Sequence, residues 1–130
     1  MRIFLDNNLA FRHARGLTAL LEPDHEVLSL RDKFPTATKD DEWLRALGRE
    51  GGWIVISGDI GIQKSPHERL AWKESGLTIF FLSRRWMSLD LYAQHAKLAL
   101  AIPKILETAR KHPRGRGFLV GINGKIEDAF

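Results

Sequence analysis

The sequence predicts an α/β protein, a three-layer α/β/α sandwich around a mostly parallel sheet of four to five strands. Apolar runs of strand length alternate with segments of helical period, and glycine and proline residues fall between them. Four strands that alternate with four helices need crossover connections, which place helices on both faces of the sheet. A length of 130 residues suits one such domain.

The first half of the chain shows this alternation clearly. A short buried strand is expected at residues 3–5, followed by a helix over 10–21 whose apolar residues recur every three or four positions. Residues 27–30 have the composition of a second strand, and 34–38 that of a loop. A second helix then buries Trp43, Leu44 and Leu47 and stops at the glycine pair 51–52.

The second half repeats the pattern. Residues 53–57 are continuous and β-branched, as expected of a strand covered on both faces. A helix begins at Ser65, an N-cap followed by proline and, three residues on, by Glu68, and it ends near Gly76. A fourth strand is expected at 78–82.

A long last helix begins at Ser88, and Pro103 is expected to kink it. We assign residues 1–112 to the main domain and residues 113–130 to a C-terminal appendage. In this appendage two apolar runs flank Asn123–Gly124, which predicts a β-hairpin.

Composition excludes several classes of protein. Hydrophobic residues make up 44% and charged residues 28% of the chain, the balance of a folded globular protein. No apolar run approaches the ~20 residues of a membrane helix, and Asp6 interrupts the N-terminal apolar stretch, so we expect a cytoplasmic protein. The absence of cysteine excludes disulfides, thiolate zinc sites and thiol nucleophiles.

The formal charge of +4 is concentrated in one segment. Residues 104–116 hold five basic side chains and one acid, an excess equal to that of the whole chain. Such a segment could attract the phosphate backbone of a nucleic acid. A solvated helix end explains it equally well.

Acidic residues follow two of the expected strands. Asp6 and Asn7 follow the first strand, and Ser57 and Asp59 lie at the end of the third. Ligands of open α/β sheets bind beyond the carboxyl ends of the strands. We therefore expect Asp6 and Asp59 at one edge.

A third group of acids begins the second helix, which enters from the same edge. Asp40 lies on the same helix side as the apolar residues four and seven positions later, whereas Glu42 points away. Asp41 follows Thr38 in a spacing that resembles a capping box, which gives it a structural explanation. The ligand from this helix is Asp40, Asp41 or Glu42.

Converging carboxylates repel one another unless a cation neutralises them. Oxygen ligands without cysteine or paired histidines favour Mg²⁺ or Mn²⁺. Such an ion can polarise a phosphoryl oxygen and orient water for in-line attack, so the pattern indicates phosphodiester hydrolysis. Taken singly, each aspartate is also a common turn former or N-cap.

Five segments over about residues 1–110 resemble a PIN-like domain of the branch related to VapC-type toxins. They are MRIFLDNNL from residue 1, LEPDHEV from 21, LRDKFP from 30, DDEWL from 40 and GGWIVISGD from 51. The resemblance implies a Mg²⁺- or Mn²⁺-dependent endoribonuclease, the toxin of a type II toxin-antitoxin system, that forms a homodimer and binds an antitoxin protein. It matches Asp6 and Asp59 to two family acids and leaves Glu68 as a weak match to a further one.

Supporting roles are expected for residues near these acids. Asn7 would orient a water on the metal, and Ser57 would hold the site through a hydrogen bond. The expected contacts to the RNA backbone come from the following basic residues: Arg12, Lys64, Arg84, Arg85 and the 104–116 segment.

Three other interpretations stay open. A PIN-like module without catalytic activity would bind RNA or a protein only. Residues 58–65 nearly match a phosphate-binding loop but carry Gln63 where the second glycine is needed. A phosphoacceptor at Asp59 would need a lysine after a later strand, where Ser83, Arg84 and Arg85 stand instead.

The remaining aromatic residues and histidines give weaker signals. Trp86 is the tryptophan outside the core pattern, beside two arginines, and could anchor the surface or stack on a base. The five histidines show no metal-ligand spacing, so we expect surface or helix positions for them.

Overall fold

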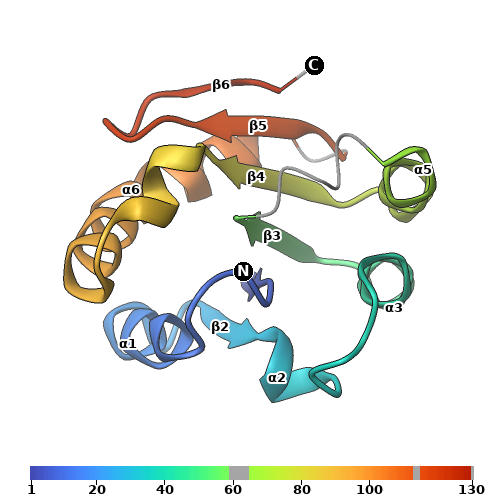
Figure 1. Ribbon diagram of the computed structural model, residues 1–130, viewed down its shortest axis with the longest axis horizontal. Helices are drawn as coiled ribbons and strands as arrows, with labels where there is room; N and C mark the ends of the chain where they lie inside the picture. Colours follow the sequence, from blue (N-terminus) through green and yellow to red (C-terminus); the bar gives the residue numbers. More distant parts are fainter. Residues whose placement is uncertain (59–64, 113–114, 130) are drawn as a thin grey trace.

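The fold is a six-stranded sheet between two layers of helices (Figure 1). The computed structural model describes residues 1–58, 65–112 and 115–129. The strands are β1 (Arg2–Leu5), β2 (Glu26–Ser29), β3 (Trp53–Ser57), β4 (Thr78–Leu82), β5 (Gly117–Val120) and β6 (Ile126–Asp128). The helices are α1 (Arg12–Leu21), α2 (Leu30–Lys33), α3 (Asp40–Glu50), α5 (Pro66–Ser75), the 3₁₀ helix η1 (Arg84–Ser88) and α6 (Leu91–Lys111).

The predicted fold class is confirmed, with a slightly larger sheet. The strand order is β2-β1-β3-β4-β5-β6, and every pair is parallel except β5 with β6. The sixth strand exceeds the expected four to five because β6 pairs antiparallel with β5 and extends the edge. No helix in the described part of the chain is both long and apolar enough to cross a bilayer.

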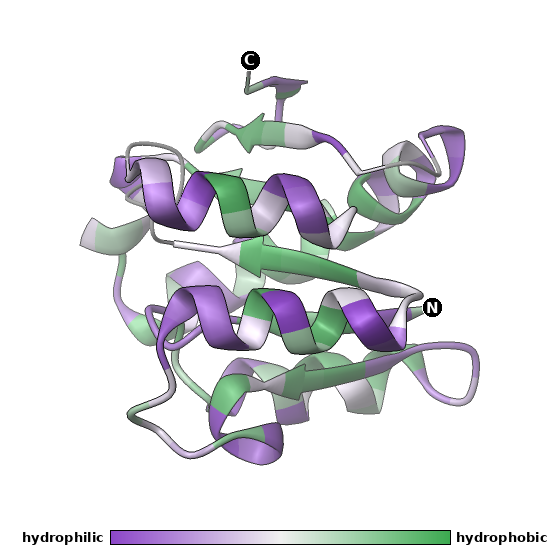
Figure 2. Ribbon diagram, turned by 90° about the vertical axis from the view of Figure 1, so that its right-hand side faces the viewer, coloured by the Kyte–Doolittle hydropathy of each residue, from purple (hydrophilic) through white to green (hydrophobic). Residues whose placement is uncertain are grey.

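The two helical layers bury separate cores. Helices α1 and α6 cover one face of the sheet, and α3 and α5 cover the other (Figure 1). Figure 2, seen from the α3 and α5 side, shows polar residues on these helices outside an apolar sheet. Both sheet faces are therefore covered, which explains why β3 and β4 are buried at every position.

The direction of winding reverses between β1 and β3. From β1 the chain moves outward to β2, then crosses back to β3 on the other side of β1. At such a switch point the two crossover helices leave on opposite faces, and a crevice opens at the carboxyl ends of the strands. Asp6 and Ser57 lie at this point.

Local differences from the sequence analysis lie between β2 and α3. Strand β2 ends at Ser29 rather than residue 30, because Ser29 and Asp32 form a capping box that starts α2. The capping box expected from Thr38 and Asp41 is wrong, since Lys39 is the N-cap of α3 and gives no side-chain cap. The N-cap at Ser65 is confirmed.

The C-terminal segment is part of the central sheet. Strand β5 pairs with β4, and β6 returns beside β5 after a turn in which the Gly124 N–H donates to the Gly121 carbonyl. Residues 115–116 lie at the amino ends of the strands, since a Cβ on Gly115 would lie 2.5 Å from the Gly76 backbone. Helix α6 is continuous through Pro103.

Candidate functional site

The centre of the candidate site is Asp6, the first residue after β1. Its N–H donates to the Ile56 carbonyl at 3.3 Å, so the β1 and β3 backbones remain paired up to this point. The residue is only 2% exposed although it carries a carboxylate. A charged side chain buried to this degree needs several hydrogen bonds to stay ionised.

Three donors from the described residues contact the Asp6 carboxylate, namely Asn8, Ser57 and Gly58. Oδ1 accepts the N–H groups of Asn8 at 3.1 Å and Gly58 at 3.4 Å. Oδ2 accepts the Ser57 hydroxyl, which occupies the place expected of a residue that holds the site. These bonds fix the orientation of the carboxylate, and carboxylate oxygens are donors of the kind that bind hard divalent cations.

The backbone at Gly58 approaches the site too closely for a side chain. A Cβ there would lie 3.0 Å from the Met87 side chain and 3.3 Å from the Cβ of Asn8. Met87 belongs to η1, which follows β4. The segments after β1, β3 and β4 therefore meet around Asp6.

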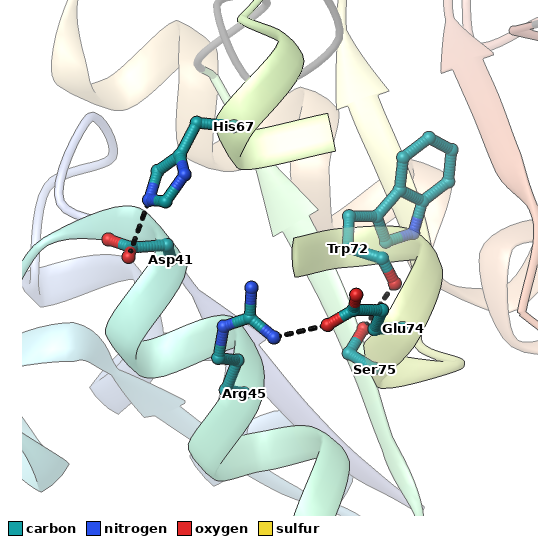
Figure 3. Close-up of polar contacts among 6 residues, drawn as sticks. All are labelled: Asp41, Arg45, His67, Trp72, Glu74 and Ser75. Atoms are coloured by element: carbon teal, nitrogen blue, oxygen red, sulfur yellow. Dashed lines mark hydrogen bonds and ion pairs between the residues drawn. The ribbon is translucent and has the colours of Figure 1, made fainter. Parts of the chain in front are cut away.

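The three acids at the start of α3 have different surroundings. Asp40 is half-buried and accepts the Trp43 indole N–H at 3.0 Å, whereas Glu42 is exposed. Asp41 forms an ion pair with His67 of α5, 2.9 Å between Oδ2 and Nε2, and Figure 3 shows this pair bridging the two helices. The hydrogen bond from His67 is the main cause of the lowered pKa of Asp41. Asp41 is thus engaged in packing α3 against α5.

The same two helices are joined a turn further along. Arg45 of α3 pairs with Glu74 of α5, and the Ser75 hydroxyl donates to the Trp72 carbonyl at the end of α5 (Figure 3). These contacts fix the beginning of α3 relative to the sheet edge.

Two of the expected site residues, Asp59 and Lys64, lie outside the described residues. The Glu68 N–H donates to the N-cap Ser65, which accounts for the position of Glu68 in α5. Within residues 1–58, 65–112 and 115–129, no group of three or more histidine or acidic side chains is arranged to hold a metal ion.

The donor chemistry that is described fits a hard divalent ion. Asp6 offers an oriented carboxylate and Asp40 a second one, and both are oxygen donors of the kind that Mg²⁺ and Mn²⁺ prefer. Asn7, the residue after Asp6, is exposed, so its side chain is accessible to water. The acids therefore suit the ion that the sequence predicted.

The basic residues divide between the two edges of the sheet. Arg12, Arg84 and Arg85 are exposed and belong to elements that begin at the carboxyl ends of β1 and β4. The described residues of the 104–116 segment lie on α6 and at the amino ends of the strands, away from the edge that carries Asp6, and their expected contact with RNA stays a prediction. Lys111 and Arg116 there pair with Glu107 and Asp128.

Two aromatic expectations are also corrected. Trp86 is fully buried and donates its indole N–H to the Val120 carbonyl at 3.1 Å, so it anchors η1 from inside and is not accessible to a base. His13 lies on a helix as expected but is fully buried, not at the surface. It bonds His95 and Gln94 of α6, and Gly16 leaves room for the His95 ring.

Sequence analysis missed Arg31 at this edge. It is the second residue after β2, one position beyond the residue that corresponds to Asp6, and its place just after a strand was the available signal.

The architecture and this edge define a class: an α/β/α protein with a buried, oriented carboxylate at the switch point of a parallel sheet. The family model described as "PIN like domain" matches residues 1–84, which hold β1 to β4 and all the described site acids. The chain therefore belongs to the PIN-like domain family. No curated protein and no solved structure gives a significant match to this chain. PIN-like domains are often nucleases.

Proposed function

We propose that this protein is a metal-dependent endoribonuclease that hydrolyses RNA phosphodiester bonds at the carboxyl edge of its sheet. The observation that carries this proposal is the Asp6 carboxylate, which is buried, held by three donors and placed at the switch point of a PIN-like sheet. A carboxylate fixed in orientation at this point of the sheet is suited to hold a divalent cation.

In this proposal Asp6, Asp40 and Asp59 hold Mg²⁺ or Mn²⁺. When bound, the ion would polarise a phosphoryl oxygen and favour attack by water. Ser57 and the Gly58 N–H hold the Asp6 carboxylate in its orientation, while Asn7 positions water at the open side of the site. Arg12, Arg84 and Arg85 hold the RNA backbone along the same edge, together with Lys64.

The experiment compares RNA cleavage by the wild type with cleavage by Asp6→Asn, each with Mg²⁺ or Mn²⁺ and again with EDTA. Asparagine keeps the shape and one acceptor oxygen of Asp6 but lacks the charge, so we expect at least a hundredfold loss, on the order reported for removed electrostatic groups in active sites. The matched control is Asp128→Asn, an exposed carboxylate at the opposite edge.

The outcomes distinguish a nuclease from a binding module without catalytic activity. Metal-dependent cleavage that Asp6→Asn abolishes and Asp128→Asn retains supports the nuclease. RNA binding without cleavage by the wild type supports the alternative, a PIN-like binding module without catalytic activity. Cleavage that survives Asp6→Asn contradicts the proposal.

We further propose a cellular role as the toxin of a type II toxin-antitoxin pair of the VapC type, active in the cytoplasm as a homodimer and neutralised by an antitoxin protein. This role rests on the likeness of the segments around Asp6 and Asp40 to that branch. The test is induced expression in bacteria, where growth should stop with the wild type and continue with Asp6→Asn. Continued growth with both, at equal protein levels, would argue against a toxin.

A further inference from the structure

A small cavity opens beside Asp6, between the carboxyl ends of β1 and β2. Its volume is about 180 Å³, and Asp6, Phe11, Ser29, Arg31 and Thr36 are among the residues that line it. The cavity therefore has the candidate metal ligand Asp6 and an arginine among its lining residues.

The sheet register places Arg31 close to Asp6. Leu5 pairs with Ser29, so the next residues, Asp6 and Leu30, leave adjacent strands that lie about 4.8 Å apart. The backbone that carries Arg31 is held by the capping box, in which Asp32 accepts both the N–H and the hydroxyl of Ser29 at 2.9 Å. The strand pairing and the capping box therefore fix the backbone of Arg31 at the cavity.

The guanidinium of Arg31 packs on an aromatic ring but forms no ion pair with a described carboxylate. It lies 4.1 Å from the ring centroid of Phe11, and Arg15 approaches the same ring at 5.9 Å. Stacking uses the face of a guanidinium and leaves the N–H groups at its edge available. No ion pair joins Arg31 to a carboxylate of the described residues, since Asp32 serves Ser29.

We propose that this cavity binds the phosphate adjacent to the scissile phosphodiester of single-stranded RNA, and that Arg31 is the residue that binds it. The inference rests on the proposed function. A carboxylate in one wall repels a phosphate, so a second anion can enter only if a cation faces it across the cavity. The planar fork of arginine matches two phosphate oxygens and gives both affinity and register.

The experiment uses the full chain carrying Asp6→Asn, so that RNA is bound without being cut. A single uncharged methylphosphonate linkage is moved along a short single-stranded RNA, and affinity is measured by fluorescence anisotropy for each version. At one linkage the neutral group should lower affinity about tenfold, the value of one charge-assisted hydrogen-bonded contact. Adding Arg31→Ala should reduce that effect to less than about twofold, because the partner of the phosphate is then already gone.

Two further variants test whether the effect is specific to the arginine at position 31. Arg31→Lys keeps the charge but loses the fork, so an intermediate effect is expected. Arg49→Ala removes an exposed arginine from the far end of α3 and should retain the full tenfold effect. A thermal melt shows whether Arg31→Ala remains folded.

The proposed subsite would be contradicted if folded Arg31→Ala lost as much affinity at each methylphosphonate position as the protein that keeps Arg31. Cleavage is not measured, so this result is separate from the test of the nuclease. If the wild type cuts RNA but the methylphosphonate effect does not depend on Arg31, only the proposed subsite is contradicted. If the effect depends on Arg31 but the wild type does not cut RNA, only the proposed nuclease activity is contradicted.

Discussion

The two edges of the sheet differ in ion pairing: several basic residues at the amino edge pair with carboxylates of the described residues, although Arg49 and Arg110 do not. At the amino edge, Glu50 pairs with Lys33 at 2.9 Å and with Arg2 at 3.9 Å, and Arg116 pairs with Asp128 at 3.3 Å. At the carboxyl edge, five arginines have no ion pair with any described carboxylate. These are Arg12, Arg15, Arg31, Arg84 and Arg85.

Under the proposed function, the arginines without an ion pair at the carboxyl edge would be available to RNA. Exposed ion pairs contribute only about 0 to 1 kcal/mol, so leaving arginines unpaired costs the fold little. An unpaired arginine, however, keeps its full field for a polyanion. The carboxyl edge combines this field with the buried Asp6, and the amino edge has no equivalent carboxylate among the described residues.

The largest expected effect comes from reversing charge at one edge and then at the other. Arg84→Glu with Arg85→Glu should weaken binding of single-stranded RNA on the order of a hundredfold at low salt, because two phosphate contacts become repulsive. The control is Arg49→Glu with Arg110→Glu, the same charge change at the ends of α3 and α6, which should alter affinity less than about threefold. Affinity is measured by anisotropy at several salt concentrations. Equal losses would mean that total charge, not the edge, attracts RNA.

An intermediate effect on stability is expected from protonation of the buried His13 at low pH. Burial lowers the pKa of His13 from its ordinary 6.5, against the hydrogen bond that His13 donates to the Gln94 amide oxygen, and a smaller repulsion from His95 lowers it further. The unfolded chain therefore takes up the proton first as pH falls. Stability should be complete above about pH 6.5 and decline below it.

Thermal melts between about pH 7.5 and pH 5 test this slope. His13→Gln can still bond Gln94 and should flatten the decline. His67→Gln, the same change at an exposed histidine paired with Asp41, should not flatten it. A decline that is unchanged in His13→Gln would assign the pH dependence to other groups.

The smallest effect should follow removal of the amino-edge pairs. Glu50→Gln loses the carboxylate that Lys33 and the Trp53 indole N–H hold, and whose pKa the Lys33 hydrogen bond lowers. Because the group is exposed, urea unfolding should show a loss below about 1 kcal/mol. RNA affinity should stay the same. A large loss of affinity would break the contrast between the edges.

Much of the fold could be read from local patterns. Strand and helix positions follow from apolar runs and periodicity, so the order of elements around Ile54 or Leu98 was predictable. The expectation that Asp6 and Ser57 meet came from one rule, that parallel strands end at the same edge. Ser57 does donate to Asp6.

The sequence-based predictions that were wrong concern residues whose surroundings are set by contacts with distant parts of the chain. Trp86 beside two arginines looked exposed, yet η1 turns it inward against Val120. Asp41 looked like an N-terminal cap, yet α5 brings His67 to it. Arg31 was overlooked because its importance comes from the β1 and β2 pairing and not from its own segment.

The sequence by itself determined the alternation of strands and helices, the absence of thiol chemistry and the position of Asp6 at the end of a strand, because these depend on residue type and spacing along the chain. Only the tertiary structure decided which basic residues share that edge, which acid of α3 is engaged elsewhere, and where a cavity opens beside Asp6. Those outcomes depend on strand order and on contacts between helices, and neither is encoded in any single segment.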